Sequence, residues 1–245
     1  MNERYKKCII GILLSVVLAS SVYQLAFLFV IGPQSVFGYV FGSNAGLASI
    51  GLDMCLIAAI ILSRDYISGF FESRSKLNIC LGFILFSIIL DLFFEISFQY
   101  STPSFQMLWV DFMFRLSFFV PWILAWVIIL YFFKFPLKST FILGGINGII
   151  GEFFIIELFF PGYGMAAALG WEPFSITMGA IITFGLYGCN LCIPFIPFKN
   201  LFEEKFNQKK HPAKYLLAVI PLYAFFIAFQ VLKVAAYSGF LFIFY

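Results

Sequence analysis

The chain has 245 residues, of which 62% are hydrophobic, 21% aromatic and 11% charged, and its formal net charge is +3. Soluble domains carry about 25% charged residues, and a chain with 36 Phe but only 15 Lys and Arg and 12 Asp and Glu cannot cover a domain of this size with a polar surface. The composition therefore excludes a soluble globular protein. It indicates an all-α, polytopic integral membrane protein with a single transmembrane domain over residues 1–245 and no nucleic-acid partner.

Apolar stretches of about 20 residues, the length that a helix needs to cross a bilayer, recur along the chain. Seven stretches meet this length: 8–31, 45–63, 77–100, 107–133, 140–160, 172–197 and 215–244. The first follows several basic residues in the manner of a signal sequence, but its apolar character continues to Ile31, which favours a retained span. The sequence thus predicts a seven-helix transmembrane bundle.

Lys and Arg are concentrated in alternate connections between these spans. Apart from Arg115 and Lys233, all of them lie in the N-terminal segment or in the second-to-third, fourth-to-fifth and sixth-to-seventh connections. The opposite connections, which contain neither Lys nor Arg, are 32–44, 101–106 and 161–171. Because basic loops stay in the cytoplasm, we expect a cytoplasmic N-terminus, an outer C-terminus and a place in the cell membrane. The longest polar segment, 199–214, is expected to form a short solvated helix.

Charged residues also lie inside the expected spans, where each costs about 2.5–3.5 kcal/mol on insertion scales. They are Asp53, Asp91, Glu95, Asp111, Arg115, Glu152 and Lys233. Counted from the outer ends of the spans at about 1.5 Å per residue, they form one band from the outer half of the bilayer to its middle. Asp91 with Glu95, and Asp111 with Arg115, are spaced i,i+4, so each pair projects from one side of its helix.

The leading interpretation of this band is a site that binds or transports a small cationic solute, a cation or protons. The acids would be ligands or proton carriers, and Arg115 and Lys233 would be internal counter-charges. The alternative is structural, with salt bridges from Arg115 to Asp91 and from Lys233 to Glu152 that lock the bundle.

Four glycines precede Glu152 in the fifth span: Gly144, Gly145, Gly148 and Gly151. Small residues at this spacing permit close packing of two helices, or a local break in the helix next to the band. The sequence favours close packing.

Metal chemistry lacks ligands in the spans. The only histidine, His211, lies in a connection, which argues against haem, di-iron and zinc sites that depend on His. Cys189 and Cys192 form a CxxC pair in the sixth span, for which packing is a simpler explanation than redox chemistry. We therefore predict no metal and no cofactor from these residues.

Lys233 carries a resemblance to a retinal-binding family. Seven spans, a cytoplasmic N-terminus and a lysine near the middle of the last span resemble the layout of heliorhodopsins, although the residues that flank Lys233 differ from theirs. The resemblance implies retinal bound to Lys233 as a Schiff base, with Glu95 or Asp91 as the counterion.

A second resemblance concerns the acidic and aromatic residues of the fifth span. Glu152-Phe153-Phe154 and Glu157-Leu158-Phe159-Phe160 are similar to stretches of the membrane-bound lycopene cyclases, without that family's proline and adjacent glutamates. It implies a membrane-embedded enzyme that acts on a lipid or isoprenoid, with Glu152, or Glu95 and Asp111 together, as general acid.

A third alternative is a structural subunit of a larger membrane complex or a homo-oligomer. Aromatic residues of the fourth span would then pack on the partner: Phe118, Phe119, Trp122 and Trp126. In this case the aromatic face would contact protein in place of lipid.

Overall fold

The computed structural model describes residue 3 and residues 5–15, 36–98, 105–159 and 173–237. Within these ranges, no side chain is described for 36–53, 94–98, 105–115, 174, 175, 178, 233 and 235–237. The regular elements of the described residues are helical, and one isolated bridge joins Phe133 to Lys209. The fold class predicted from the sequence, all-α, is therefore confirmed.

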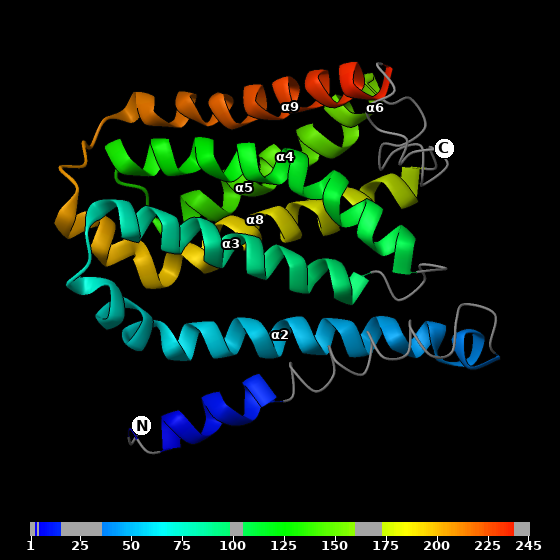
Figure 1. Cartoon of the computed structure of the whole chain (residues 1–245), viewed down its shortest axis with the longest axis horizontal. Helices are drawn as coiled ribbons and strands as arrows, with labels where there is room; N and C mark the ends of the chain where they lie inside the picture. The colour runs from blue at the N-terminus through cyan, green and yellow to red at the C-terminus, as the bar shows by residue number, and fades with distance from the viewer. Residues whose placement is uncertain (1–2, 4, 16–35, 99–104, 160–172, 238–245) are drawn as a thin grey trace.

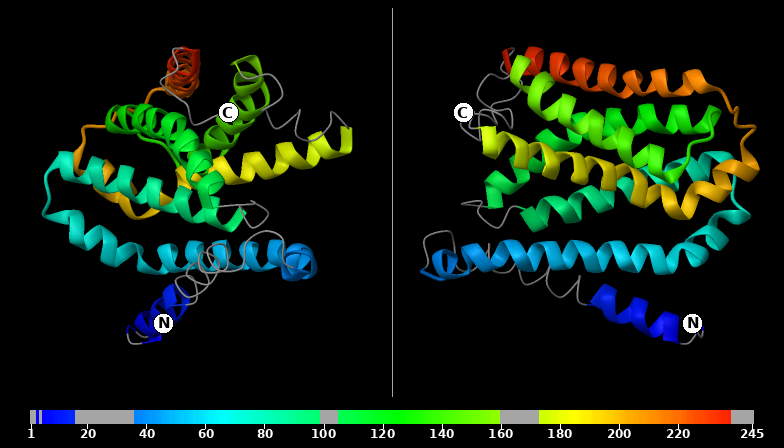
Figure 2. Two further views of the ribbon diagram at one scale, coloured as in Figure 1. Left: turned by 45° about the vertical axis from the view of Figure 1, so that its right-hand side comes forward. Right: turned by 180° about the vertical axis from the view of Figure 1, so that it is seen from behind.

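Long helices lie side by side along one common direction (Figure 1). In chain order the elements are α2 (Val36–Glu72), α3 (Lys76–Phe98), α4 (Phe105–Phe132), α5 (Leu137–Ile150), η2 (Gly151–Ile155), α6 (Ile156–Phe159), α8 (Pro173–Lys205), η3 (Pro212–Ala218) and α9 (Val219–Tyr237). The helical residues 5–15 lie outside α2 on one side of the array, and α9 lies on the opposite side (Figures 1 and 2). Helix α8 lies in the middle, where it packs on α2, α3 and α5.

The helices have the length and composition of membrane spans. Among the described residues, five helical segments are long and apolar enough to cross a bilayer: Met54–Glu72, Lys76–Phe93, Leu137–Phe159, Gly179–Lys205 and Pro212–Leu232. The described part of α4, Leu116–Phe132, is apolar but shorter. A helix satisfies its own backbone hydrogen bonds, which lipid cannot do, so these segments fold as helices despite Pro121 in α4 and Pro194 and Pro197 in α8.

Two expectations about the connections are wrong. Helix α2 begins at Val36, so most of the stretch 32–44 is helix rather than a loop; in a bilayer, helical hydrogen bonding outweighs the preference of Gly, Ser and Asn for turns. The predicted solvated helix over 199–214 is also absent, because α8 continues to Lys205, and both Phe202 and the following Phe206 are buried. The connections 101–104 and 161–171 and most of the first span lie outside the described residues.

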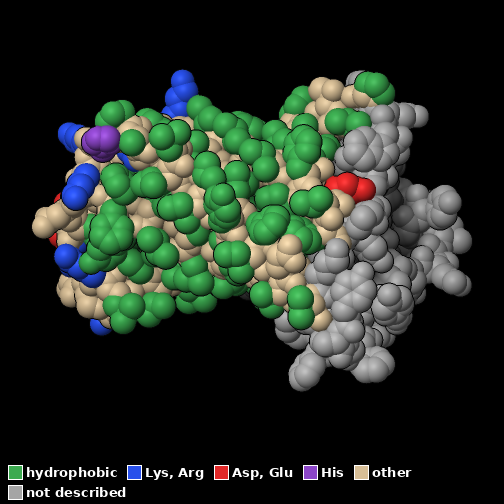
Figure 3. Space-filling view, turned by 90° about the horizontal axis from the view of Figure 1, so that it is seen from above, with side chains coloured by type: hydrophobic (Ala, Val, Ile, Leu, Met, Phe, Trp, Pro, Cys, Tyr) green, Lys and Arg blue, Asp and Glu red, His purple; other side chains and the backbone are tan. Residues whose placement is uncertain are grey.

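The outer surface of the array is apolar along its middle. On α3, Leu77, Leu81, Leu85 and Ile89 are exposed at a spacing of one residue in four, which forms a stripe along one face. In the space-filling view, hydrophobic side chains cover the middle, and Lys, Arg and His gather at one end (Figure 3). Such a surface suits lipid contact and marks an integral membrane protein.

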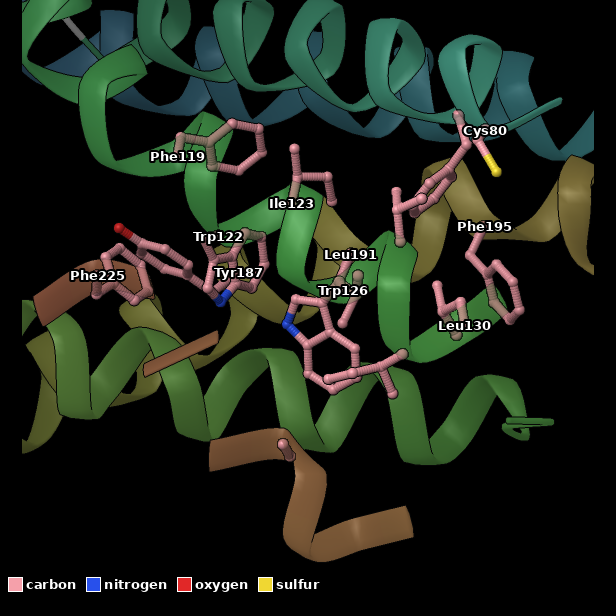
Figure 4. Packing of buried hydrophobic residues seen from close by; sticks show 14 of the residues in the cluster. Cys80, Phe119, Trp122, Ile123, Trp126, Leu130, Tyr187, Leu191, Phe195 and Phe225 are labelled. Atoms are coloured by element: carbon pink, nitrogen blue, oxygen red, sulfur yellow. The ribbon is translucent and has the colours of Figure 1, made fainter. Parts of the chain in front are cut away.

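Aromatic side chains form much of the interior. Phe118, Phe119, Trp122 and Trp126 of α4 are buried inside the chain's own core. Figure 4 shows the last three of them among the other core side chains. The expectation that these four residues form a face for a partner is therefore wrong. They alternate along α4 with exposed residues such as Leu124 and Ile128. The face of α4 that carries these large aromatic side chains therefore points into the protein.

Candidate functional site

A line of polar side chains runs along one face of α8. Thr183, Tyr187 and Asn190 are all buried and are spaced i, i+4, i+7, which places them on the same side of the helix. Polar groups in a membrane interior are expensive unless they serve a partner or a function. This polar face of α8 (Thr183, Tyr187 and Asn190) is therefore the starting point for the site.

Asp91 of α3 meets the polar face at Asn190. The Asn190 Nδ2 group donates a hydrogen bond of 2.7 Å to Asp91 Oδ1, and Asp91 is only 1% exposed. A neutral amide donor stabilises a carboxyl group without neutralising its charge. The contact therefore holds the carboxyl group in the interior against α8.

Glu152 meets the same face one turn away. The Tyr187 hydroxyl donates a hydrogen bond of 2.5 Å to Glu152 Oε1, and Glu152 itself is half-buried. Tyr187 and Asn190 are separated by about 4.5 Å along the helix axis, at about 1.5 Å per residue. Two carboxyl groups from different helices thus converge on neighbouring levels of α8.

The helix that carries Glu152 is locally distorted. Residues Gly151–Ile155 form a π-helical turn, in which the Ile156 N–H donates to the Gly151 carbonyl five residues earlier. Single π-helical turns inside α-helices occur often at functional sites, because the extra residue redirects the side chains of the turn. Glu152 lies in this turn, which gives it a different direction from the one that a regular helix would impose.

Close packing holds α5 against the polar face. A Cβ atom at Gly148 would collide with the Tyr187 side chain, and one at Gly144 would lie 2.8 Å from the Tyr187 carbonyl oxygen. On α8, a Cβ at Gly188 would lie 2.8 Å from the Phe141 ring. The glycines therefore do both things that the sequence allows: they permit close packing on α8, and Gly151 begins the distorted turn.

A second buried network borders Tyr187. The Trp122 Nε1–H donates to Asn147 Oδ1 at 3.2 Å, and Asn147 Nδ2 donates to the Ala218 carbonyl at 3.1 Å. The Trp122 ring packs edge-on against Tyr187, with ring centroids 5.5 Å apart, and Phe225 lies next to both (Figure 4). These contacts fix the Tyr187 ring and thereby the direction of its hydroxyl group.

Two oxygen atoms of the polar face accept no hydrogen bond from any described residue: Asn190 Oδ1 and Thr183 Oγ1, both buried. Buried polar atoms normally have a partner. Because Asn190 bonds to Asp91 through its Nδ2, its Oδ1 is a buried oxygen acceptor next to a carboxyl group. Hard cations are bound by such oxygens.

The remaining predicted site residues lie outside the described side chains. They are Asp53, Glu95, Asp111, Arg115 and Lys233. The predicted salt bridges of Arg115 with Asp91 and of Lys233 with Glu152, and a retinal Schiff base on Lys233, therefore stay predictions. Among the described residues, no three His, Cys, Asp or Glu side chains are grouped closely enough to hold a metal ion.

The partners on α8 were not predicted from the sequence. Tyr187, Thr183 and Asn190 are not among the predicted site residues. The signal was available in the i, i+4, i+7 spacing of three polar residues in an otherwise apolar span.

Cys189 and Cys192 are free thiols, and Cys192 Sγ lies 3.5 Å from the Leu137 carbonyl oxygen.

The described helices define the class of protein: an all-helical membrane protein with polar and acidic groups in its interior. No protein family, curated protein or solved structure matches the chain. Its function therefore has to be argued from the residues themselves.

Proposed function

We propose that the chain is a seven-span membrane protein that binds or moves protons or a small cation at Asp91 and Glu152. The observation that carries this proposal is the convergence of two carboxyl groups, from α3 and from the π-helical turn, on the donors Asn190 and Tyr187 of one helix face. Carboxyl groups arranged in this way line proton and cation pathways in membrane proteins.

The physical chemistry of burial supports this function. A carboxylate in an apolar interior has to be balanced by a proton, a cation or an internal counter-charge. Neutral donors such as Tyr187 and Asn190 can hydrogen-bond to both the protonated and the ionised carboxyl group, so these contacts are compatible with either state. Asn190 Oδ1 adds an oxygen ligand for a cation next to Asp91.

The proposed orientation has a cytoplasmic N-terminus and an outer C-terminus. It is supported by the gathering of basic side chains at one end of the described surface (Figure 3), which the positive-inside rule assigns to the cytoplasm. Seven spans require residues 8–31 and all of α4 to cross the bilayer as well. A phosphatase fused after Tyr245 tests this orientation, because the enzyme is active only outside the cytoplasm; an inactive fusion contradicts it.

Flux through proteoliposomes tests the function. The protein is reconstituted in vesicles with a proton gradient or a gradient of one monovalent or divalent cation, and flux is followed by a fluorescent indicator. Asp91→Asn and Glu152→Gln should each abolish the flux that wild type shows. Glu204→Gln is the matched control, because it removes an exposed carboxyl group from the basic end of α8, the helix that carries the polar face.

Two results would contradict the proposal. One is flux that both intramembrane variants retain at the wild-type level. The other is an equal loss of flux in Glu204→Gln, which would attribute the effect to the surface charge and not to the interior carboxyl groups.

Acid catalysis on an isoprenoid is a second candidate function. The observation that favours it is the aromatic cluster next to Glu152: Tyr187, which bonds to Glu152, packs together with Trp122 and Phe225. A carboxylic acid can protonate a carbon–carbon double bond, and aromatic faces stabilise the carbocation that results. Deuterium incorporation into a linear isoprenoid in heavy water, lost in Glu152→Gln but kept in Asp91→Asn, would identify this activity; no incorporation by wild type excludes it.

A further inference from the structure

A cavity of about 290 Å³ opens at the basic end of the helices, apart from the carboxyl groups of the interior. It lies where the connection between α4 and α5 meets the last turns of α8 and the segment before η3. Its charged lining consists of Lys134, Lys199, Lys210, Lys214 and Glu203. Four ammonium groups face one carboxylate, so the cavity has a strong excess of positive charge.

Three of the four lysines, Lys134, Lys199 and Lys214, are held in place by the surrounding chain. Glu203 bonds to Lys134 and lies 2.7 Å from the Lys199 ammonium group, while Lys214 Nζ donates to the Lys134 carbonyl at 2.5 Å. The bridge between Phe133 and Lys209 joins the two connecting segments that carry these residues. Each ammonium group has three donors, so these contacts orient the lysines and leave donors for an anion.

The wall of the cavity is apolar and rigid on one side. Phe135 and Pro136 line it, and the Lys214 ammonium group lies 4.9 Å from the centre of the Phe135 ring. Pro136 is also the N-cap of α5, so the positive end of that helix lies next to the cavity and adds to its attraction for anions.

The size and surroundings of the cavity indicate a headgroup. Pockets for small molecules measure about 300–1,000 Å³, so 290 Å³ accommodates a phosphate with a small substituent but not a large ligand. Tyr215, whose ring packs edge-on against Phe135, is 44% exposed, and its neighbour Leu216 is 73% exposed. An acyl chain that leaves the cavity along this side would find apolar contacts.

We propose that this cavity binds the phosphate group of an anionic phospholipid from the membrane leaflet at the basic end. Basic pockets between membrane helices are suited to such headgroups, because both lysine charge and phosphate lie at the depth of the interface. The bound lipid would link the α4–α5 connection to the end of α8. This inference concerns a different part of the chain from the proposed flux site and does not depend on it.

Lipid binding by the intact protein tests the proposal. Protein in a neutral detergent is titrated with short-chain phosphatidylglycerol or short-chain phosphatidylcholine, and bound lipid is counted by native mass spectrometry. We expect tight binding of one phosphatidylglycerol and much weaker binding of phosphatidylcholine. Inorganic phosphate is the competitor: displacement of the lipid at similar concentrations would assign the site to free phosphate and overturn the lipid assignment.

Variants localise the binding. Lys210 is exposed, so Lys210→Gln leaves the fold intact, and its affinity for phosphatidylglycerol should fall roughly fivefold, the usual effect of one lysine near a lipid surface. Lys138→Gln is the matched control, since Lys138 is also exposed at this end but does not line the cavity. Equal affinity in wild type and in both variants, or equal loss in both, would overturn the proposal.

Discussion

The basic end and the helix interior use charge in opposite ways. At the basic end, lysines contact backbone carbonyls and a carboxylate: Lys205 Nζ donates to the Arg74 carbonyl at 3.1 Å, and Lys199 pairs with Glu203. In the interior, the described carboxyl groups of Asp91 and Glu152 accept from an amide and from a phenol. Charge near water is inexpensive to keep, whereas charge in the interior costs several kcal/mol. The comparison teaches that lysines hold the connections at the water-exposed end, whereas the interior acids are held by side chains of a neighbouring helix.

The two regions are expected to differ most in how much stability the protein loses when a glycine is replaced. Gly148→Leu should destabilise the protein by about 1–3 kcal/mol or more, because the new side chain would overlap Tyr187 in a packed interface. Gly69→Leu, near the basic end of α2, should have little effect, because nothing lies within 4 Å of a Cβ there. Thermal unfolding in detergent measures both. Similar midpoints for the two variants would show that the α5–α8 contact is not tightly packed.

The next largest effect is expected at the Asp91 contact. Asn190→Leu removes the amide donor from a buried carboxyl group and should cost about 1–3 kcal/mol. The double variant Asp91→Leu with Asn190→Leu removes both partners and should regain part of that loss. Additive losses in this double-mutant cycle would mean that the two side chains do not interact.

A smaller effect is expected at Tyr187. Tyr187→Phe keeps the ring that packs on Trp122 but removes the hydroxyl that bonds to Glu152, which should cost about 1 kcal/mol. In the Glu152→Gln background the same substitution should cost less. Thermal unfolding compares the two losses of stability. Proteoliposome flux should fall in Tyr187→Phe, but it should persist in Phe184→Leu, because Phe184 follows Thr183 in the sequence and is not part of the polar face. Unchanged flux in Tyr187→Phe would separate the phenol from the transport step.

The smallest effect is expected at the basic end. Lys205→Met removes a half-exposed donor to the carbonyls of Glu72 and Arg74 and should change stability by less than about 1 kcal/mol, since solvent replaces the lost contacts. Flux should be unaffected. A loss as large as that of Asn190→Leu would show that the two regions do not differ in the way proposed.

Hydropathy predicts the helices of this chain well but not their contacts. The bounds of α3, the bounds of α5 to α6 and the start of α8 follow from apolar runs, because a bilayer leaves the backbone no alternative to a helix. The end of α8 does not, since the helix continues beyond the apolar run to Lys205. The partners of the acids depend on which helices become neighbours: Asp91 and Asn190 are 99 residues apart in sequence, and Glu152 and Tyr187 are 35 apart. The inward turn of Trp122 and Trp126 was missed for the same reason, since α4 is apolar on all sides and its pattern does not distinguish lipid from protein.

The π-helical turn at Gly151–Ile155 divides one membrane span between two neighbours. Before the turn, Gly144 and Gly148 pack on α8; after it, Phe159 packs on Phe226 of α9, with ring centroids 4.9 Å apart. The turn thus separates the part of the span that packs mainly on α8 from the part that packs on α9. Glu152 lies within this turn. Deleting one residue there would rotate the following side chains by about 100°, so the length of this turn is itself part of what the sequence encodes.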